Sequence, residues 1–346
     1  MKNLYLRKFY YWYILLETLD IFCLLDYSCF LFLMTVIFII VYSLILLNYK
    51  TMQELNGSFV ALVSPMKSNG DIDHSALKKL IDWHIEEGTD GIVSVGTTGE
   101  SATVNFNEHI ELIKYTVDYV NNRVPVIAGT GANSTSEALD LTIESEKNGA
   151  DYALLVTPYY NKPTQAGLIK HYTKIADSCN IPQILYNVPS RTSCDLLPET
   201  VKHLSNHKNI VGIKEAVNDK QRINDLINIS KDNDNFKILS GDDPTFCEFL
   251  QLGGDGVISV AANVIPNDIS KICKAVRNNN NEEATEINKK YFNLYELLFI
   301  ESNPIPVKWM LYKMGLIDNI LRLPLIELDT KYHEIISAEM IKLQLI

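Results

Sequence analysis

Eight short apolar runs, each ending in polar or glycine-containing residues, constrain the fold of this 346-residue chain more than any other feature. Successive runs begin 20 to 33 residues apart. Apolar residues that follow one another without alternation are typical of parallel strands that are covered on both faces. We therefore expect eight such strands. The runs occupy residues 59–65, 91–100, 124–131, 152–160, 181–190, 210–216, 236–243 and 256–263.

Amphipathic segments lie between these runs. Apolar residues recur at helical spacing over residues 77–85 and 110–120. Ser134 and Glu137 have the spacing of a capping box, and Pro198 suits the first turn of a further helix. Eight strand–helix units favour an α/β fold of the closed (β/α)8 type, the TIM barrel, over a doubly wound sheet.

The pattern after Pro266 indicates helices alone. We therefore expect a barrel over residues 55–265 and a C-terminal helical appendage over residues 266–346. The candidate helices cover residues 267–278, 282–300, 305–314 and 330–343.

Residues 1–54 form a hydrophobic N-terminal extension that differs from the rest of the chain. Residues 27–49 carry no charge over 23 positions, enough for a helix to span a hydrocarbon core of about 30 Å. Positive charges flank this run on both sides, which leaves the orientation of such a transmembrane helix open. A start at Met52 would instead make these residues an over-extended gene start, and a processed leader is the third interpretation.

The composition indicates which kinds of partner the chain binds and in which cellular compartment it works. Acidic residues outnumber basic ones by 42 to 31, and no basic cluster indicates a nucleic-acid partner. Six cysteines without a CxxC pair are typical of a reduced, cytoplasmic protein. The seven histidines form no HxH or HExxH motif, so we expect no metal site. We expect His109 at a helix surface or an interface.

Lys214 is the most informative residue at the strand ends, where a TIM barrel has its active site. It directly follows the apolar residues 210–213 and would point into an apolar barrel. Burial lowers the pKa of an amine and makes it a nucleophile toward a carbonyl group. Pairing with a buried carboxylate such as Glu215 is the alternative. The pattern assigns no role to Lys308.

Hydroxyl groups and an arginine end the neighbouring runs. Hydroxyl groups near the amine that can relay protons would come from Thr97, Thr98, Tyr160 and Tyr186, although a strand-end tyrosine can equally fill a core. Arg191 suits a substrate carboxylate or a salt bridge within its loop. The glycine-rich turns match no nucleotide-binding motif.

Seven segments resemble one protein family. They are GTTGES, TPYYNKP, YNVPSRT, GIKEA, LSGDD, GVISVAAN and NPIPVK, in this order. Together they resemble the dihydrodipicolinate synthase (4-hydroxy-tetrahydrodipicolinate synthase) family, within the pyruvate-dependent N-acetylneuraminate lyase superfamily. The resemblance runs from about residue 57 to the C-terminus.

The resemblance implies a lyase that condenses pyruvate with L-aspartate 4-semialdehyde to 4-hydroxy-tetrahydrodipicolinate, in the diaminopimelate route to L-lysine. It implies neither a metal nor an organic cofactor. Lys214 would form a Schiff base with pyruvate, and Tyr186 would donate and accept protons. Thr97 and Tyr160 would complete the proton relay, with Tyr160 reaching a neighbouring subunit's site.

The same resemblance implies the substrate-binding residues. Thr98 and Ile258 would contact pyruvate, Ile258 through its backbone. Arg191 would receive the carboxylate of the semialdehyde, and Gly241 would border the bound substrate.

A homotetramer, built as a dimer of dimers, and inhibition by L-lysine are further implications. Phe106 stands where many bacterial members have a histidine, so the strength of inhibition is left open. The lysine site would comprise Ser101, Ala102, His109, Asn133, Glu137 and Tyr159.

More than one function is compatible with the sequence. Sialic acid lyases and keto-deoxy sugar acid aldolases share the lysine and the tyrosine, whereas Arg191 and the pair Thr97 and Thr98 favour the synthase. Two functions without catalysis also fit the chain, a barrel that only binds a ligand and a membrane-tethered barrel that serves interaction.

Overall fold

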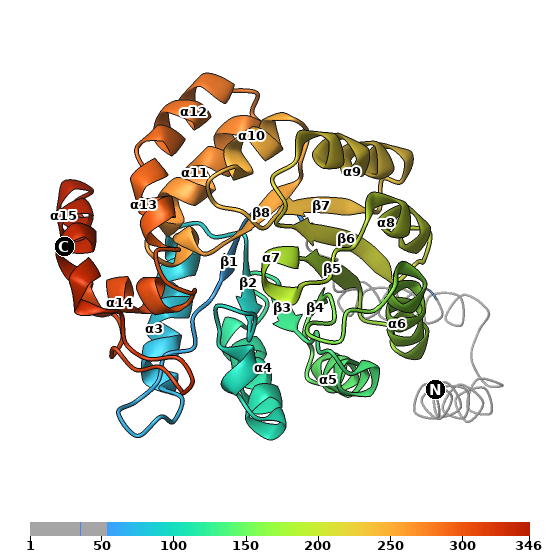
Figure 1. The fold of residues 1–346 in the computed structure, drawn as a ribbon, viewed down its shortest axis with the longest axis horizontal. Helices are drawn as coiled ribbons and strands as arrows, with labels where there is room; N and C mark the ends of the chain where they lie inside the picture. Colours follow the sequence, from blue (N-terminus) through green and yellow to red (C-terminus); the bar gives the residue numbers. More distant parts are fainter. Residues whose placement is uncertain (1–34, 36–53) are drawn as a thin grey trace. The chain divides into compact units, whose positions relative to one another are not determined.

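The sheet closes into a barrel of eight parallel strands (Figure 1). The computed structural model describes Thr35 and residues 54–346. The strands pair in sequence order, and β8 pairs with β1. The predicted TIM barrel is therefore confirmed, and each predicted run overlaps a strand. The strands are β1 Gly57–Ala61, β2 Gly91–Ser94, β3 Val126–Gly129, β4 Tyr152–Val156, β5 Gln183–Asn187, β6 Ile210–Glu215, β7 Lys237–Ser240 and β8 Gly256–Ser259.

Strand side chains divide between the barrel interior and the surrounding helices, because successive residues of a strand face opposite sides. Phe59, Tyr152 and Leu239 belong to the interior cluster. Lys214 on β6 lies opposite Tyr186 on β5 in the strand register. Both side chains border the cavity at the strand ends.

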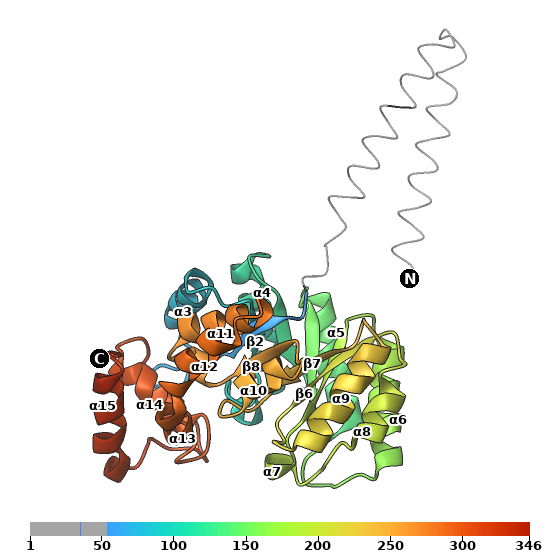
Figure 2. The ribbon, with the colours of Figure 1, turned by 90° about the horizontal axis from the view of Figure 1, so that it is seen from above.

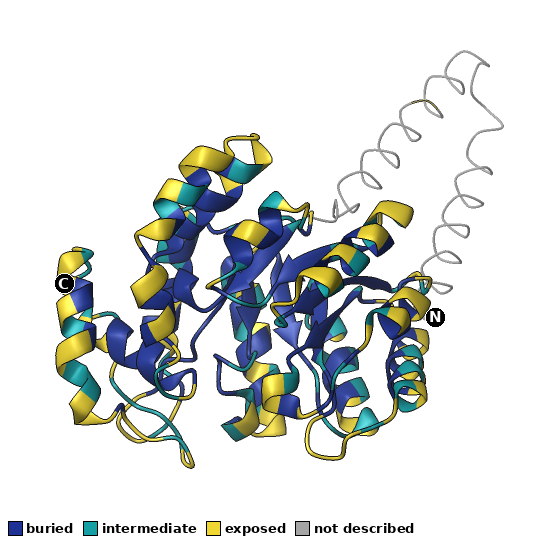
Figure 3. Cartoon of the chain, turned by 45° about the horizontal axis from the view of Figure 1, so that its top comes forward, coloured by how far each residue is buried: buried dark blue, intermediate teal, exposed yellow. Residues whose placement is uncertain are grey.

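Helices cover the outside of the barrel and bury their apolar faces against it (Figure 3). The amphipathic segments predicted at 77–85 and 110–120 are parts of α3 and α4. The helices of the barrel are α3 His74–Glu86, α4 Phe106–Val120, α5 Thr135–Lys147, α6 Gln165–Ser178, α7 Pro189–Thr192, α8 Pro198–Leu204, α9 Lys220–Asp232, α10 Phe246–Gln251 and α11 Pro266–Arg277, with short 3-10 turns η2 Ser101–Thr103 and η3 Ala261–Asn263.

Two expectations about helix starts have different outcomes. Pro198 is the first residue of α8, as predicted. Ser134 does precede α5, but its side chain makes no capping hydrogen bond. Its Oγ instead lies 2.9 Å from Oγ of Ser136. The predicted capping box with Glu137 is therefore wrong, because a nearer hydroxyl engages the serine.

The C-terminal region is helical, but its second predicted helix is broken. Residues 282–300 contain α12 Asn281–Lys289 and α13 Phe292–Leu297. Tyr291 stands at the corner between them, and its hydroxyl donates to Asp268 on α11 at 2.6 Å. The other elements are α14 Ile305–Lys313, η4 Thr330–Tyr332 and α15 His333–Lys342.

Helices α13, α14 and α15 gather at one side of the barrel (Figure 2). Helix α11 packs against β1, so it completes the ring of barrel helices. Residues 53–346 form one compact unit. A division of this unit at residue 265 stays a prediction.

A buried ion pair ties the C-terminal region to the loop after β2. Lys308 Nζ on α14 lies 2.6 Å from Glu100 Oε1, and both side chains are fully buried. Glu100 Oε2 also accepts from the backbone N–H of Arg322, at 3.1 Å. Lys308, which the sequence left without a role, therefore anchors the loop that carries Thr97 and Thr98.

Among the described residues, no helix is long and apolar enough to cross a membrane. The predicted span at 27–49, apart from Thr35, and the alternative start at Met52 lie outside these residues.

Replacing Lys308 by Met is expected to lower the free energy of unfolding by about 3–5 kcal/mol, because it leaves the Glu100 carboxylate buried without its charge partner. The double variant Lys308→Met, Glu100→Gln is expected to recover part of this loss. Urea unfolding of the three proteins measures it. A single variant as stable as the wild type would contradict this account of the pair.

Candidate active site

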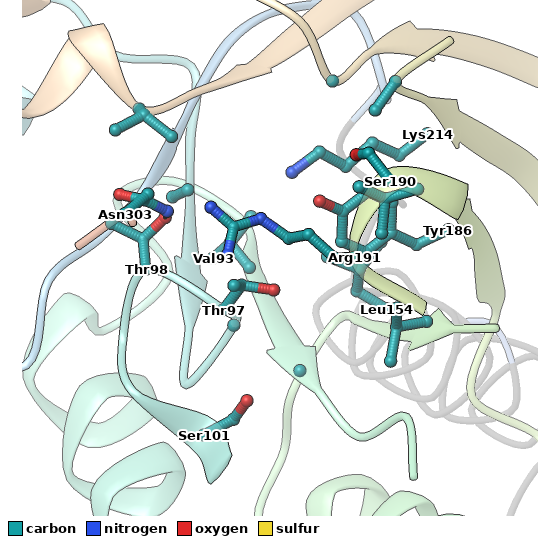
Figure 4. Close-up of a pocket in the computed structure, with 18 of the residues that line it drawn as sticks. Val93, Thr97, Thr98, Ser101, Leu154, Tyr186, Ser190, Arg191, Lys214 and Asn303 are labelled. Atoms are coloured by element: carbon teal, nitrogen blue, oxygen red, sulfur yellow. The ribbon is translucent and has the colours of Figure 1, made fainter. Parts of the chain in front are cut away.

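A cavity of about 530 Å³ opens at the carboxyl ends of the strands (Figure 4). Polar side chains from several strands and loops converge on it, as expected of a TIM barrel. Six of the eight predicted catalytic and substrate-binding residues line this cavity. They are Thr97, Thr98, Tyr186, Arg191, Lys214 and Gly241.

Lys214 is buried in the wall of the cavity, with 5% of its surface exposed. Its Nζ lies 4.2 Å from the centroid of the Tyr186 ring. No carboxylate within residues 54–346 comes within salt-bridge distance of this amine. Glu215, the alternative partner, instead accepts hydrogen bonds from Asn187 at 3.1 Å and from Arg222 at 3.3 Å. The alternative to a reactive amine, a pair between Lys214 and Glu215, is therefore not found.

Burial lowers the pKa of Lys214 to about 7. The charge of Asp243 opposes this shift, and that of Arg191 reinforces it. A large fraction of the amine is therefore uncharged near neutral pH. An uncharged amine is the form that attacks a carbonyl carbon.

Gly241 leaves room for the Lys214 side chain. A Cβ atom at this position would lie 2.8 Å from Cε of Lys214 and 3.1 Å from its Cγ. Both distances are shorter than ordinary van der Waals contact. The glycine is therefore required by the close approach of the lysine.

Tyr186 supplies a protonated phenol next to the amine. Burial raises its pKa to about 12, although Arg191 and a hydrogen bond with Thr97 act in the opposite direction. A phenol with such a pKa is neutral at pH 7 and can donate its proton. Thr97 extends this chain of hydroxyl groups across the cavity.

Asn303 is a cavity residue that the sequence analysis missed. It belongs to the segment 299–303 between α13 and α14, which forms one wall of the cavity. Its Nδ2 donates to Thr98 Oγ1 at 3.0 Å, and Figure 4 shows the two side chains next to each other. Because Thr98 Oγ1 accepts this bond, its own hydrogen can point to a ligand. Asn303 is the first residue of the NPIPVK motif, which could have indicated its place in the site.

Arg191 reaches into the cavity from the short helix α7 (Figure 4). Within residues 54–346, no carboxylate lies within salt-bridge distance of its guanidinium group. The alternative of a loop salt bridge is therefore not seen in the described part of the chain. A positive charge that faces a cavity without a partner suits a ligand carboxylate.

Two predicted site residues do not line this cavity. Tyr160 is 88% exposed and has a left-handed backbone, with φ at 74°. Ile258 lies in the barrel interior with 1% of its surface exposed, whereas Val260, two residues later, borders the cavity.

The predicted lysine-site residues gather around a second cavity of about 360 Å³. His109 is buried, and its Nε2 lies 2.7 Å from the carbonyl oxygen of Gly129. The expectation that it lies at a helix surface is wrong for this chain, because its ring packs inward on that carbonyl. Asn133 does not line the cavity, but its backbone hydrogen-bonds Tyr159. The lining includes Ser101, Ala102, Phe106, His109, Glu137 and Tyr159.

The chain matches the model of the dihydrodipicolinate synthetase family over residues 54–342. The chain belongs to this family. The match leaves out the N-terminal extension and takes in both cavities. Within residues 54–346, no three or more His, Cys, Asp or Glu side chains group so that they could hold a metal ion.

Relatives in this family are similar over nearly their whole length. The 4-hydroxy-tetrahydrodipicolinate synthase of Saccharophagus degradans is 55% identical over 279 residues, which cover 81% of this chain and 95% of the relative. A crystal structure of the chloride-inhibited dihydrodipicolinate synthase of Acinetobacter baumannii with pyruvate is 48% identical, with a TM-score of 0.83. That match covers 85% of this chain and all of the other.

One family member has been solved with lysine bound. This structure, from Cyanidioschyzon merolae, is 37% identical, has a TM-score of 0.81, and covers 84% of this chain and 99% of the other.

Replacing Gly241 by Ala is expected to slow the reaction of Lys214 with an α-keto acid by more than about tenfold, because the new methyl group displaces the amine. The rate at which borohydride reduction traps the adduct measures this effect. Gly167→Ala, on α6, is the control. A Cβ at this position would meet its nearest neighbour, Pro163 Cβ, at an ordinary 3.4 Å. Equal rates in both variants would contradict the steric role of Gly241.

The reaction of Lys214 with an α-keto acid is expected to speed up with pH through an inflection near pH 7. The sign follows from the chemistry, because raising the pH through the pKa increases the fraction of neutral amine. The pH dependence of borohydride trapping checks this. An inflection near 10, the ordinary value for lysine, would show that burial does not tune the amine.

Proposed function

We propose that this chain is a 4-hydroxy-tetrahydrodipicolinate synthase, a lyase of the diaminopimelate route to L-lysine that condenses pyruvate with L-aspartate 4-semialdehyde. The observation that carries the proposal is the buried Lys214 amine, without an ion-pair partner among the described residues and next to the Tyr186 phenol. Two relatives that are 55% and 54% identical to this chain carry this name.

Pyruvate binds first in the proposed mechanism. Thr98 and the backbone near Ile258 hold its carboxylate, which places the keto carbon next to Lys214. The neutral amine adds to this carbon, and loss of water leaves a protonated imine. Tyr186 and Thr97 supply and remove the protons that these steps exchange. No metal or organic cofactor is needed for this sequence.

The protonated imine then acts as an electron sink. A proton leaves the pyruvate methyl group, and the resulting enamine attacks the aldehyde carbon of the semialdehyde. Arg191 holds the carboxylate of this second substrate. The substrate's own amine finally attacks the imine carbon and closes the ring, which expels Lys214. The one water released in imine formation balances the overall condensation.

A second copy of the chain completes the site in this proposal. Tyr160 is the remaining member of the proton relay, but it is 88% exposed and does not line the cavity of its own chain. Phe106 and Tyr159 are also partly exposed on this part of the molecule, and Leu323 is 80% exposed. We infer that a partner covers this surface and receives Tyr160, within a homotetramer built as a dimer of dimers. One solved relative is described as a monomeric variant, so the assembly needs a direct measurement.

The second cavity is proposed as the site at which L-lysine inhibits the enzyme. Glu137 and Tyr159 offer polar groups to an amino acid there, and Phe106 contributes an aromatic wall. A lysine complex of a family member supports this assignment. The four described cysteines are buried thiols, which suits a reducing cytoplasm.

The choice of aldehyde tests the proposed function against the other branches of the superfamily. The kcat/KM of the full chain is expected to be highest for aspartate semialdehyde, compared with N-acetylmannosamine and glyceraldehyde. Arg191→Met is expected to lower kcat/KM for the semialdehyde by roughly 10- to 100-fold, since one charge-assisted bond to the carboxylate is lost.

One control variant and two contrary outcomes complete this experiment. Lys214→Ala is expected to abolish turnover of every aldehyde and to keep the circular dichroism spectrum of the wild type. Preference for a sugar aldehyde would move the enzyme to the sialic acid or keto-deoxy sugar acid branch. No turnover with any aldehyde would favour a barrel that only binds a ligand.

A further inference from the structure

The segment 188–197 joins β5 to α8 and carries Arg191 into the cavity from the short helix α7 (Figure 4). Within residues 54–346, the Arg191 guanidinium takes part in no hydrogen bond. The place of this group therefore depends on the backbone of the segment, called the Arg191 segment below.

Asn187, the last residue of β5, closes the Arg191 segment on itself. Its side chain is buried, and its Oδ1 accepts from the backbone N–H of Leu196 at 2.9 Å. Its Nδ2 donates to Asp195 Oδ1, also at 2.9 Å. These two bonds hold the end of the segment next to its start.

Arg222 on α9 holds the same end from the other side. Its Nη2 donates to Asp195 Oδ2 at 2.6 Å, and its Nη1 donates to the carbonyl oxygen of Leu196 at 3.1 Å. Nη1 also lies 3.3 Å from Oε2 of Glu215, the last residue of β6, whose side chain is only 1% exposed. The guanidinium group thus ties the Arg191 segment to the strand that carries Lys214.

Hydrogen bonds also connect this anchor with Arg191 along the chain. Thr192, the next residue, donates from Oγ1 to the carbonyl oxygen of Cys194 at 2.9 Å and accepts from the N–H of Cys194 at 3.2 Å. Thr157, which follows β4, donates to Thr192 Oγ1 at 3.2 Å. Because Thr192 and Cys194 are buried, a shift of residues 195–196 moves the backbone of Arg191 as well.

We propose that Arg222 is a positioning residue for the second substrate, because it holds the Arg191 segment against β6 and so fixes the place of the Arg191 guanidinium. The inference rests on the role of Arg191 in the proposed function. Lys214 does not need this support, since β6 pairs it with Tyr186 on one side and with Leu239 on the other. Loss of Arg222 therefore acts on the second substrate and spares the reaction with pyruvate.

The variant Arg222→Met tests this role by comparing the two substrates. The KM for aspartate semialdehyde is expected to rise about tenfold, because a displaced guanidinium binds the carboxylate less well. The rate of borohydride trapping with pyruvate is expected to stay within about twofold of the wild type, since Lys214 keeps its place. A merely structural role would change both quantities to the same extent, or neither.

A double variant shows whether Arg222 acts through Arg191. Adding Arg222→Met to Arg191→Met is expected to raise the KM for the semialdehyde no further than Arg191→Met does alone. The steady-state kinetics of the two single variants and the double variant measure this. A further rise in the double variant would contradict the proposed route through Arg191.

A second double variant separates position from stability. Arg222→Met leaves the Glu215 carboxylate buried without its charge partner, which destabilises the fold. Arg222→Met, Glu215→Gln removes this charge as well, and it serves if the single variant does not fold. This protein is expected to regain thermal stability but to keep the raised KM for the semialdehyde. A wild-type KM in the stabilised protein would show that Arg222 has a structural role only.

Leu226→Ala is the matched control. Leu226 is fully buried on the same helix, α9, so a cavity there lowers the Tm without touching the Arg191 segment. Its KM for the semialdehyde is expected to equal that of the wild type. A rise as large as in Arg222→Met would show that any destabilisation of α9 has this effect, and would overturn the proposal.

The outcomes separate this inference from the proposed function. Wild-type protein that does not turn over the semialdehyde would overturn the proposed function and this inference together. Normal turnover in the wild type, with an unchanged KM for the semialdehyde in Arg222→Met, would overturn only the role of Arg222.

Discussion

The burial of one amine without a contacting counter-ion is the constraint on which the other features of the site depend. A lysine inside a protein loses the hydration of its charge, and the usual remedy is an ion pair. Lys214 has no such pair among the described residues, and its pKa falls to about 7. Burying this amine without a counter-ion lowers the stability of the fold, but it also makes the amine reactive, since a paired amine would remain a cation. Strained or destabilised groups of this kind are typical of functional sites.

The surrounding structure accommodates this amine at several points. The register of β5 and β6 places Tyr186 opposite Lys214. Glu215, the next residue, lies on the other side of the strand, where Arg222 and Asn187 compensate its charge. Gly241 leaves space along the lysine stem. Each feature is local, but together they leave the amine as the reactive group of the cavity.

The C-terminal helical region, which follows the barrel in the sequence, contributes residues to the site. Asn303 bonds Thr98, and Lys308 pairs with Glu100 in the same loop. These contacts fix the loop that carries the two threonines. The helical region therefore forms part of the wall of the active site, as well as packing on the barrel.

The sequence predicted the strands, because their apolar pattern is local. It also predicted the barrel and the cluster of strand-end residues, because every TIM barrel has its active site at the strand ends. The partners of Lys308 and Thr98 did not follow, since each bond joins residues more than 200 positions apart. The capping box failed because Ser136 engages Ser134. The break between α12 and α13 was not predicted either; Tyr291, which stands there, bonds Asp268 on a different helix.

The most direct test of the central claim is to identify the residue that reacts with pyruvate. The full chain would be incubated with pyruvate at neutral pH, reduced with borohydride, digested and analysed by peptide mass spectrometry. The account predicts a single reduced three-carbon adduct on Lys214. An adduct on another lysine, or catalytic turnover of pyruvate without any adduct on Lys214, would contradict it.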